Sequence, residues 1–217
     1  MIFTRQNRIF NPNKQLSKIT IIGVGSTGSF IALNLAKLGF NNIKVIDYDK
    51  VEAENIPNQF YREQDIGKLK TEAIKEIIKD FTGTEIEVEN VKIDKDYNFD
   101  CELNEIIIFC LDNMPSRKLI YEKIKDIPIK IIDTRMGGEG YQIYSVDLTD
   151  EEGKEKFEKR LNAVTMDTTC GEKSVIYTIL SIASETCQIC KMIDKGEKYP
   201  KILKRQMTNY KILGGIK

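Results

Sequence analysis

The chain has 217 residues, 41% hydrophobic and 30% charged, and its 33 Lys and Arg side chains balance its 33 Asp and Glu side chains. This balance gives no basic surface for nucleic acid or an anionic membrane, and no apolar run is long enough to span a bilayer. The polar N-terminus lacks the apolar stretch of a signal peptide, so we expect a cytoplasmic protein. The sequence contains no histidine, which excludes Ser-His-Asp and Cys-His catalysis and histidine-ligated metal sites.

Hydrophobic patterning predicts alternating strands and helices in the first two thirds of the chain. The predicted strands lie at residues 18–22, 43–46, 85–91, 105–110 and 129–133, and the predicted helices at residues 29–38, 71–81 and 115–125. Such alternation is typical of an α/β fold with a Rossmann-like, doubly wound and mostly parallel sheet.

The pattern changes after about residue 140. An alternating run typical of an edge or antiparallel strand comes first, then a charge-rich solvated helix or loop, a long buried helix and a last strand. These features lie at residues 141–146, 150–160, 173–193 and 204–213. We therefore expect a C-terminal antiparallel extension at 140–217 within one nucleotide-binding domain at 18–217, preceded by an N-terminal arm at 1–17.

A glycine-rich turn joins the first predicted strand to the first helix. Gly23, Gly25 and Gly28 fit the pattern G-x-G-x-x-G. In that pattern the first glycine permits a tight turn, the second lets phosphate approach the backbone, and the third lets helix and sheet pack closely. Asp47 ends the second strand, where a carboxylate can accept hydrogen bonds from a ribose. The turn predicts nucleotide binding, with a purely structural turn as the alternative.

Residues 47–70 carry a more specific pattern, which reads D-Y-D-K-V-E-A-E-N-I-P-N-Q and then D-I-G-K-L-K. A later strand ends in C-L-D-N, with Arg117 four residues after the Asn. These motifs resemble the ThiF/MoeB group of ubiquitin-activating-type adenylyltransferases. The resemblance extends to Arg5 and Arg8 in the N-terminal arm and to Cys170, and so covers most of the chain.

The resemblance implies roles for individual residues. Asp47, with Asp49 beside it, would bind the ribose end of ATP, while Asn55, Asn58 and Gln59 belong to the loop that orders the triphosphate. The remaining implied residues are Lys70 for phosphate charge, Asp112 for Mg²⁺, Asn113 in support of that site, and Arg8, which would reach the phosphates of the neighbouring subunit of a homodimer. The implied reaction converts a carboxylate and ATP into an acyl-adenylate and pyrophosphate.

Two departures from the family pattern stand out. Asn58 occupies the position where the family usually has arginine, and nearby Arg62 is the candidate replacement. Zinc-binding relatives carry two CxxC pairs, whereas this chain has only Cys187 and Cys190, so we expect these cysteines to be buried in a helix rather than bound to zinc.

Other residues leave alternatives open. Cys170 either accepts the activated acyl group, aided by a helix N-terminus that lowers the pKa of its thiol, or merely begins the helix. Cys101 and Cys110 are expected to be structural, Cys110 in a buried strand. Residues 133–135, followed by Gly137 and Gly138, either shape a groove for an incoming peptide tail or form a turn before the next strand.

The leading functional hypothesis is an ATP-dependent adenylyltransferase that activates the C-terminal carboxylate of a ubiquitin-like or sulfur-carrier protein ending in Gly-Gly. Within the same fold, a small molecule, a peptide or a tRNA base could be the substrate instead. A catalytically inert subunit is the alternative that Asn58 keeps open. An NAD-dependent oxidoreductase ranks last, because residues 49–70 have no task in hydride transfer.

Overall fold

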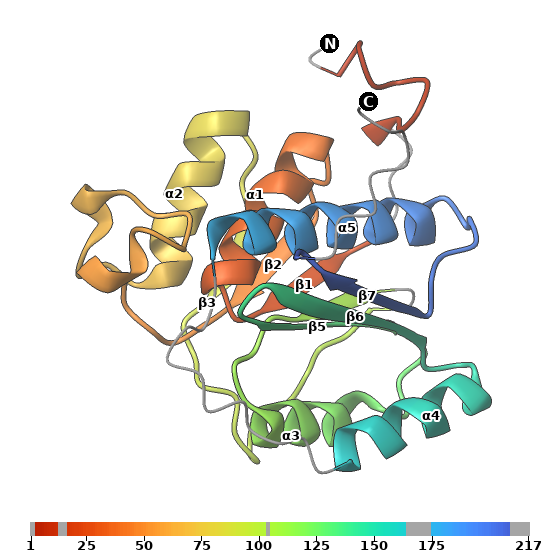
Figure 1. The fold of residues 1–217 in the computed structure, drawn as a ribbon. Helices are drawn as coiled ribbons and strands as arrows, with labels where there is room; N and C mark the ends of the chain where they lie inside the picture. The colour runs from red at the N-terminus through yellow and green to blue at the C-terminus, as the bar shows by residue number, and fades with distance from the viewer. Residues whose placement is uncertain (1–2, 13–16, 103–104, 164–174, 209–217) are drawn as a thin grey trace.

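The computed structural model describes residues 3–12, 17–102, 105–163 and 175–208. A seven-stranded sheet forms its centre, in the order β3-β2-β1-β4-β5-β6-β7 (Figure 1). The strands from β3 to β5 are parallel, and β6 and β7 pair antiparallel with their neighbours. The predicted doubly wound, mostly parallel sheet with an antiparallel C-terminal extension is confirmed.

The central strands are short and rich in isoleucine, as expected for parallel strands covered on both faces. The strands are β1 (Ile19–Ile22), β2 (Ile43–Ile46), β3 (Glu87–Glu89), β4 (Ile106–Phe109), β5 (Lys130–Gly137), β6 (Gly140–Asp147) and β7 (Ile202–Gln206). The helices are α1 (Ser26–Leu38), α2 (Lys70–Thr82), α3 (Met114–Ile124), α4 (Glu151–Asn162) and α5 (Ile176–Asp194), with short 3-10 turns η2 (Ala53–Asn55) and η3 (Glu63–Asp65).

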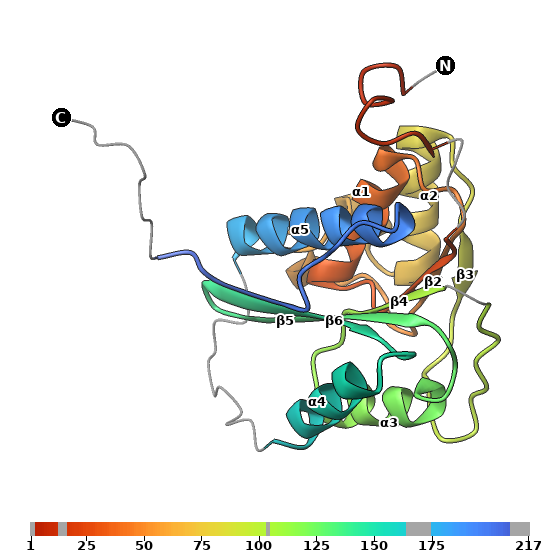
Figure 2. The ribbon, with the colours of Figure 1, turned by 90° about the vertical axis from the view of Figure 1, so that its right-hand side faces the viewer.

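Helices cover both faces of the sheet. Figure 2 shows α1, α2 and α5 on one side, and α3 and α4 on the other. Successive side chains of a strand point to opposite faces, so Ile106 and Ile108 join the core under α1 and α5, whereas Ile107 and Phe109 join the core over α3 and α4. In the described part of the chain, no helix is long and apolar enough to cross a bilayer.

The order of the strands reverses direction beside β1. The chain passes from β1 to β2 and β3 on one side and then returns to β4 on the other side. Ile22, Ile46 and Phe109 lie in register at the carboxyl ends of these three strands. In open α/β sheets, ligands bind at this kind of switch point, outside the carboxyl ends of the strands.

Several predicted boundaries change. Helix α1 begins at Ser26, within the glycine turn, so that Gly28 belongs to the helix, and the edge strand β3 is shorter than predicted. Cys110 follows β4 and does not lie within it. The charge-rich segment is the helix α4, whose N-cap Asp150 accepts a hydrogen bond from the Gly153 amide.

The C-terminal elements also begin and end differently from the prediction. Strand β7 occupies Ile202–Gln206, and the predicted strand residues 209–213 lie outside the described residues. Helix α5 begins at Ile176, with Val175 as its N-cap. Its predicted first residues, 173 and 174, also lie outside the described part of the chain.

Candidate functional site

The glycine turn lies at the switch point and is packed at two of its three glycines. Gly23 has a φ of +89°, and a Cβ there would lie 2.5 Å from the carbonyl oxygen of Cys110. A Cβ on Gly28 would lie 1.9 Å from the carbonyl oxygen of Gly23. A Cβ on Gly25 would meet nothing within 4 Å. The turn is therefore tight where it joins the sheet and open at Gly25, where a phosphate needs access to the backbone.

Asp47 ties the end of β2 to this turn. Its Oδ2 accepts a hydrogen bond from the Val24 amide at 2.8 Å, and its Oδ1 accepts one from the Asp49 amide at 2.9 Å. Each carboxylate oxygen can accept a second hydrogen bond, so the predicted contact with a ribose remains compatible with this arrangement.

The segment after β2 is a loop whose two ends are hydrogen-bonded to each other. Lys50 and Leu69 form an antiparallel bridge. The Val51 amide donates to the Lys68 carbonyl at 2.9 Å, and the Gly67 amide donates back to the Val51 carbonyl at 2.8 Å. Gly67 adopts a φ of +89°, which favours glycine. We call residues 50–69 the β2–α2 loop.

Closure of the β2–α2 loop brings Asp49 beside Lys70. The Lys70 amide donates to the Asp49 carbonyl, and Lys70 Nζ lies 3.1 Å from Asp49 Oδ2. Lys70 begins α2 with only 9% of its side chain exposed, whereas the Asp49 side chain is 49% exposed. Two predicted site residues that are far apart in the sequence thus meet at the carboxyl edge of the sheet.

The β2–α2 loop is also bonded to the glycine turn, through residues that the sequence analysis did not identify. The Tyr61 hydroxyl donates to the Val24 carbonyl at 2.6 Å, and burial raises the pKa of this hydroxyl. Ser29 Oγ donates to the Gly25 carbonyl at 2.7 Å and accepts from the Phe60 amide at 3.0 Å. Neither Tyr61 nor Ser29 belongs to a motif that would have marked it.

The three predicted amide side chains of this loop have different surroundings. Asn55 Oδ1 accepts from the Glu52 amide at 3.0 Å and so caps η2. Asn58 Oδ1 and Gln59 Oε1 are buried, and neither has a hydrogen-bond partner within the described residues. Buried acceptors are nearly always paired, so these two amides are the polar groups of the loop most in need of a ligand.

The loop after β4 carries the predicted magnesium residue. Asp112 and Asn113 are exposed, and Asn113 Nδ2 donates to Asp112 Oδ1 at 2.8 Å. Asn113 Oδ1 accepts from the Ser116 amide at 2.8 Å and caps α3, which has Pro115 in its first turn. Asn113 therefore orients the carboxylate of Asp112 and begins the helix.

The buried side chain of Arg117 anchors the loop after β4. Its side chain is 5% exposed and donates to the carbonyls of Leu111, Asn113 and Thr134. Its Nε donates to Asp133 Oδ1 at 2.8 Å.

Residues 133–135 form no turn, because β5 continues to Gly137. Asp133 is fully buried, with Arg117 on one carboxylate oxygen and Arg135 on the other, the latter at 2.7 Å. Arg135 also lies over the ring of Tyr144, 4.8 Å from its centroid. Asp133 is therefore a structural partner of Arg117, and the predicted turn before the next strand follows β5 at residues 138–139, where Gly137 pairs with Gly140.

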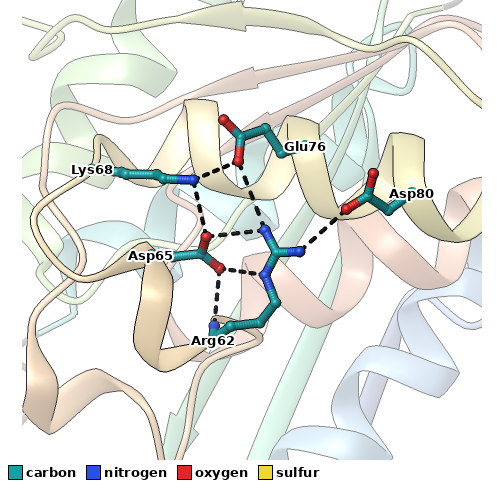
Figure 3. Close-up of polar contacts among 5 residues, drawn as sticks. All are labelled: Arg62, Asp65, Lys68, Glu76 and Asp80. Atoms are coloured by element: carbon teal, nitrogen blue, oxygen red, sulfur yellow. Dashed lines mark hydrogen bonds and ion pairs between the residues drawn. The ribbon is translucent and has the colours of Figure 1, made fainter.

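The guanidinium of Arg62 faces the carboxylates of Asp65, Glu76 and Asp80 (Figure 3). Its guanidinium donates to Asp65 through Nε and Nη2, at 2.8 and 3.0 Å, and to Asp80 through Nη1 at 3.2 Å. Glu76 Oε2 lies 3.7 Å from Nη2. The candidate replacement for the family arginine is therefore already engaged by three carboxylates.

The N-terminal arm that carries Arg8 packs at the C-terminal end of α1, the end away from the glycine turn: Gln6 Nε2 donates to the Leu38 carbonyl, and a Cβ on Gly39 would lie 2.5 Å from Pro12. In the same arm, Phe10 stacks on Phe40 just beyond the C-cap of α1, with ring centroids 5.2 Å apart, and the Ile9 carbonyl accepts from Lys195. The 13 residues of α1 span about 20 Å. Arg8 is therefore remote from the phosphate end of its own chain.

Burial raises the pKa of all four described cysteines. Cys187 and Cys190 are buried on α5, where burial raises the pKa of both thiols. Burial also raises the pKa of Cys110 to about 12 and that of Cys101 to about 11. Cys170 lies outside the described residues, and α5 begins only at Ile176.

Within the described residues, no group of three or more Cys, Asp or Glu side chains could hold a metal ion by itself. Mg²⁺ at nucleotide sites is commonly bound through one or two carboxylates together with phosphate oxygens. A lone exposed carboxylate such as Asp112, beside an open glycine turn, fits that donor set.

The model of the ThiF family matches residues 9–214. The chain belongs to the ThiF family. The matched range includes the glycine turn, the β2–α2 loop with Lys70, and the Asp112–Asn113 pair.

Curated relatives match about half of this ThiF chain. The NEDD8-activating enzyme E1 catalytic subunit of Caenorhabditis elegans is 35% identical over 122 residues, which are 55% of this chain and 28% of that protein. Ubiquitin-like modifier-activating enzyme 5 of the same species is 31% identical over 115 residues, 47% of this chain and 27% of that protein. Adenylyltransferase and sulfurtransferase MOCS3 of Caenorhabditis briggsae is 28% identical over 111 residues, which are 50% of this chain and 28% of that protein. The match thus spans less than a third of each relative.

Solved structures share the fold. Escherichia coli MccB crystallised with ATP has a TM-score of 0.71 at 17% identity, over 90% of this chain and 65% of that chain. PaaA has a TM-score of 0.65 at 20% identity, over 90% of this chain and 75% of that chain.

Proposed function

We propose that this ThiF protein is an ATP-dependent adenylyltransferase that activates the C-terminal carboxylate of a ubiquitin-like or sulfur-carrier protein. The observation that carries the proposal is the meeting of the glycine turn, Asp47, the Asp49–Lys70 pair and Asp112 at one edge of the sheet. The names of the relatives, which include two activating enzymes and an adenylyltransferase, support the reaction class.

The reaction suits a chain without histidine. A carboxylate is already ionised at neutral pH, so one of its oxygens can attack the α-phosphorus of ATP without a general base. The new bond joins that oxygen to phosphorus, and the bond from the α-phosphorus to the bridging oxygen breaks to release pyrophosphate. The protein needs to position the two reactants and neutralise charge.

The residues of the carboxyl edge divide this work. The open backbone at Gly25 would receive phosphate, and Asp47 would accept from the ribose hydroxyls. Lys70, which is nearly buried and is held in place by its ion pair with Asp49, would neutralise the negative charge that develops on the departing pyrophosphate. Asp112 would hold Mg²⁺, which supplies further neutralisation of phosphate charge when bound, and Asn113 would orient that carboxylate.

The N-terminal arm supports a homodimer. Arg8 is separated from the glycine turn of its own chain by the length of α1. A catalytic contact from Arg8 would therefore have to be made to a neighbouring subunit. We propose this arrangement together with an arm at 1–17, a single domain at 18–217, and a cytoplasmic location, which the free thiols of the four described cysteines support.

Pyrophosphate exchange into ATP tests the proposal. With Mg²⁺ and a small protein ending in Gly-Gly, we expect labelled pyrophosphate to enter ATP only when both are present. The Asp112→Ala variant should lower the exchange rate roughly hundredfold, whereas Asp126→Ala, at an exposed aspartate paired with Lys154, should leave it unchanged. Equal exchange by wild type and Asp112→Ala would contradict the assignment.

The competing function is an inert ThiF subunit. Asn58 brings no charge to the site, and Arg62 is engaged by acidic side chains. An inert subunit would bind Mg–ATP and yet catalyse no exchange with any carrier protein. An NAD-dependent oxidoreductase would instead bind NAD and ignore ATP.

A further inference from the structure

Arg62 lies at the centre of a cluster of five charged residues that joins the β2–α2 loop to helix α2 (Figure 3). We call it the Arg62 cluster; its members are Arg62, Asp65, Lys68, Glu76 and Asp80. Glu76 and Asp80 are four residues apart, so both point from the same face of α2. Lys68 bridges Asp65 at 3.3 Å and Glu76 at 2.6 Å.

Asp65 is the buried member of the cluster. Its side chain is fully buried and accepts four hydrogen bonds: from the Arg62 amide at 3.0 Å, from Arg62 Nε and Nη2 at 2.8 and 3.0 Å, and from Lys68 Nζ at 3.3 Å. Burial alone would raise the pKa of Asp65, but these hydrogen bonds outweigh it and lower the pKa. The ionised carboxylate therefore fixes the backbone at residues 62–68.

The part of the loop fixed in this way lies between two parts of the candidate site. On one side are Asn58 and Gln59, whose buried oxygens have no partner within the described residues. On the other side the chain runs into Lys70, whose amide is bonded to the Asp49 carbonyl. A loop that opened at Arg62 would displace the side chains on both sides.

The cluster is unsuited to bind phosphate. All three nitrogens of the Arg62 guanidinium face carboxylates, and the three carboxylates of the cluster outnumber its two cations. A triphosphate would therefore approach a region of net negative charge.

We propose that Arg62 is a positioning residue, which holds the β2–α2 loop on α2 and thereby sets Asn58, Gln59 and Lys70 for ATP, and that it does not take the place of the family arginine at Asn58. This inference rests on the proposed function for its ATP site. The loop-holding part stands on the contacts of Arg62 alone.

The test compares Arg62→Met and Arg62→Lys with Lys79→Met, a control on helix α2 that removes a cation whose partner Glu85 is exposed. Amide hydrogen exchange is measured without nucleotide, and Mg–ATP affinity is measured by calorimetry. In Arg62→Met we expect amide exchange at residues 52–70 to become at least tenfold faster while β1 and β4 stay protected. We also expect the Kd for ATP to rise about tenfold, because the loop conformation that binds ATP becomes a minor state. Arg62→Lys should restore part of both losses. If Arg62→Met fails to fold, Asp80→Asn removes a single exposed partner and should move both readings in the same direction.

Each other outcome overturns the proposal. Loop exchange equal to that of Lys79→Met would show that Arg62 does not hold the loop. Weaker ATP binding with unchanged loop exchange would make Arg62 a direct ligand, and faster exchange with unchanged ATP binding would separate the cluster from the site. Failure of the wild type to bind ATP would refute the proposed function, whereas the exchange comparison would still decide whether Arg62 holds the loop.

Discussion

The two loops that leave the carboxyl ends of β2 and β4 carry the charged groups of the candidate site, but they are held in different ways. The β2–α2 loop is long and partly exposed, and the charged side chains of the Arg62 cluster fasten it to α2. The loop after β4 is short, and one buried arginine, Arg117, donates to three of its neighbouring carbonyls and to buried Asp133.

Because of this difference, the two loops should affect different properties: the loop after β4 the stability of the whole fold, and the β2–α2 loop the binding of ATP. Arg117 and Asp133 are both buried, and breaking a buried ion pair costs far more than breaking an exposed one, whereas Arg62 is 36% exposed and its removal leaves Asp65 paired with Lys68. Substitution of Arg117 should therefore lower the stability of the whole protein, whereas substitutions in the Arg62 cluster should first destabilise the β2–α2 loop.

Replacing Arg117 should have the largest effect. Arg117→Met leaves the carbonyls of Leu111 and Thr134 without their donor and removes one of the two cations on Asp133, so we expect a loss of about 3–5 kcal/mol in the free energy of unfolding. Urea denaturation measures it. The control Arg205→Met, at an exposed arginine paired with Glu185, should cost less than about 1 kcal/mol. Similar losses in the two variants would show that burial does not set the cost.

The glycine turn contacts both loops and offers a matched pair of substitutions. Gly28→Ala places a Cβ 1.9 Å from the Gly23 carbonyl, so the backbone must shift at a cost of about 1–3 kcal/mol or more. Gly25→Ala meets open space and should cost no more than about 1 kcal/mol, yet it should weaken ATP binding because the methyl group occupies the approach to the backbone. Thermal unfolding and calorimetry distinguish the two. Unchanged ATP affinity in Gly25→Ala would place the phosphates elsewhere.

Asp65 makes the stability of the β2–α2 loop dependent on pH. Because the pKa of Asp65 is lower in the folded protein than its ordinary value, the carboxylate stabilises the fold above about pH 4 and this contribution is lost as the pH falls through the folded pKa. Asp65→Asn should therefore cost about 1–3 kcal/mol at neutral pH, and the gap from wild type should shrink below about pH 4. Urea denaturation over a pH series measures the gap, with exposed Asp126→Asn as control. A gap that stayed constant or widened in acid would contradict the ionised state of Asp65.

Tyr61→Phe should have the smallest effect. It removes one buried hydrogen bond, from the hydroxyl to the Val24 carbonyl, and retains the ring, so we expect a loss of about 1 kcal/mol. Because this bond joins the β2–α2 loop to the glycine turn, the Kd for ATP should rise as well. A stability loss without any change in ATP affinity would mean that the loop keeps its place without Tyr61.

Local patterns predicted most of the fold. The β-branched runs of β1, β2 and β4 and the glycine turn between strand and helix each encode their structure within a few residues, and β2 matches its predicted bounds. Boundaries that depend on tertiary contacts were missed. The strand β5 extends beyond Asp133 because β6 pairs with it as far as Gly137. No local pattern in residues 133–137 predicts that pairing.

For the candidate site, the motifs predicted Asp47, Asp49, Lys70 and Asp112 as site residues, and the structure has them at the carboxyl edge of the sheet. The motifs did not show which contacts hold these residues. Arg62 was a candidate phosphate ligand in the sequence because its charge lies near Asn58. One carboxylate partner, Asp65, lies three residues away in η3, but the other two come from α2, up to 18 residues away. Only the packing of the loop on that helix brings these two carboxylates to Arg62. Tyr61 and Ser29 were missed for the same reason.

Transfer of label from ATP tests the proposed adenylation most directly. The wild-type protein is incubated with Mg²⁺, a small protein ending in Gly-Gly, and ATP labelled in either the α- or the γ-phosphate. We predict that the α-label travels with the carrier protein and that the γ-label leaves as pyrophosphate, with both transfers lost in Asp112→Ala. A γ-label on the carrier, or no label on any such carrier despite ATP binding, would contradict carboxylate adenylation by this chain.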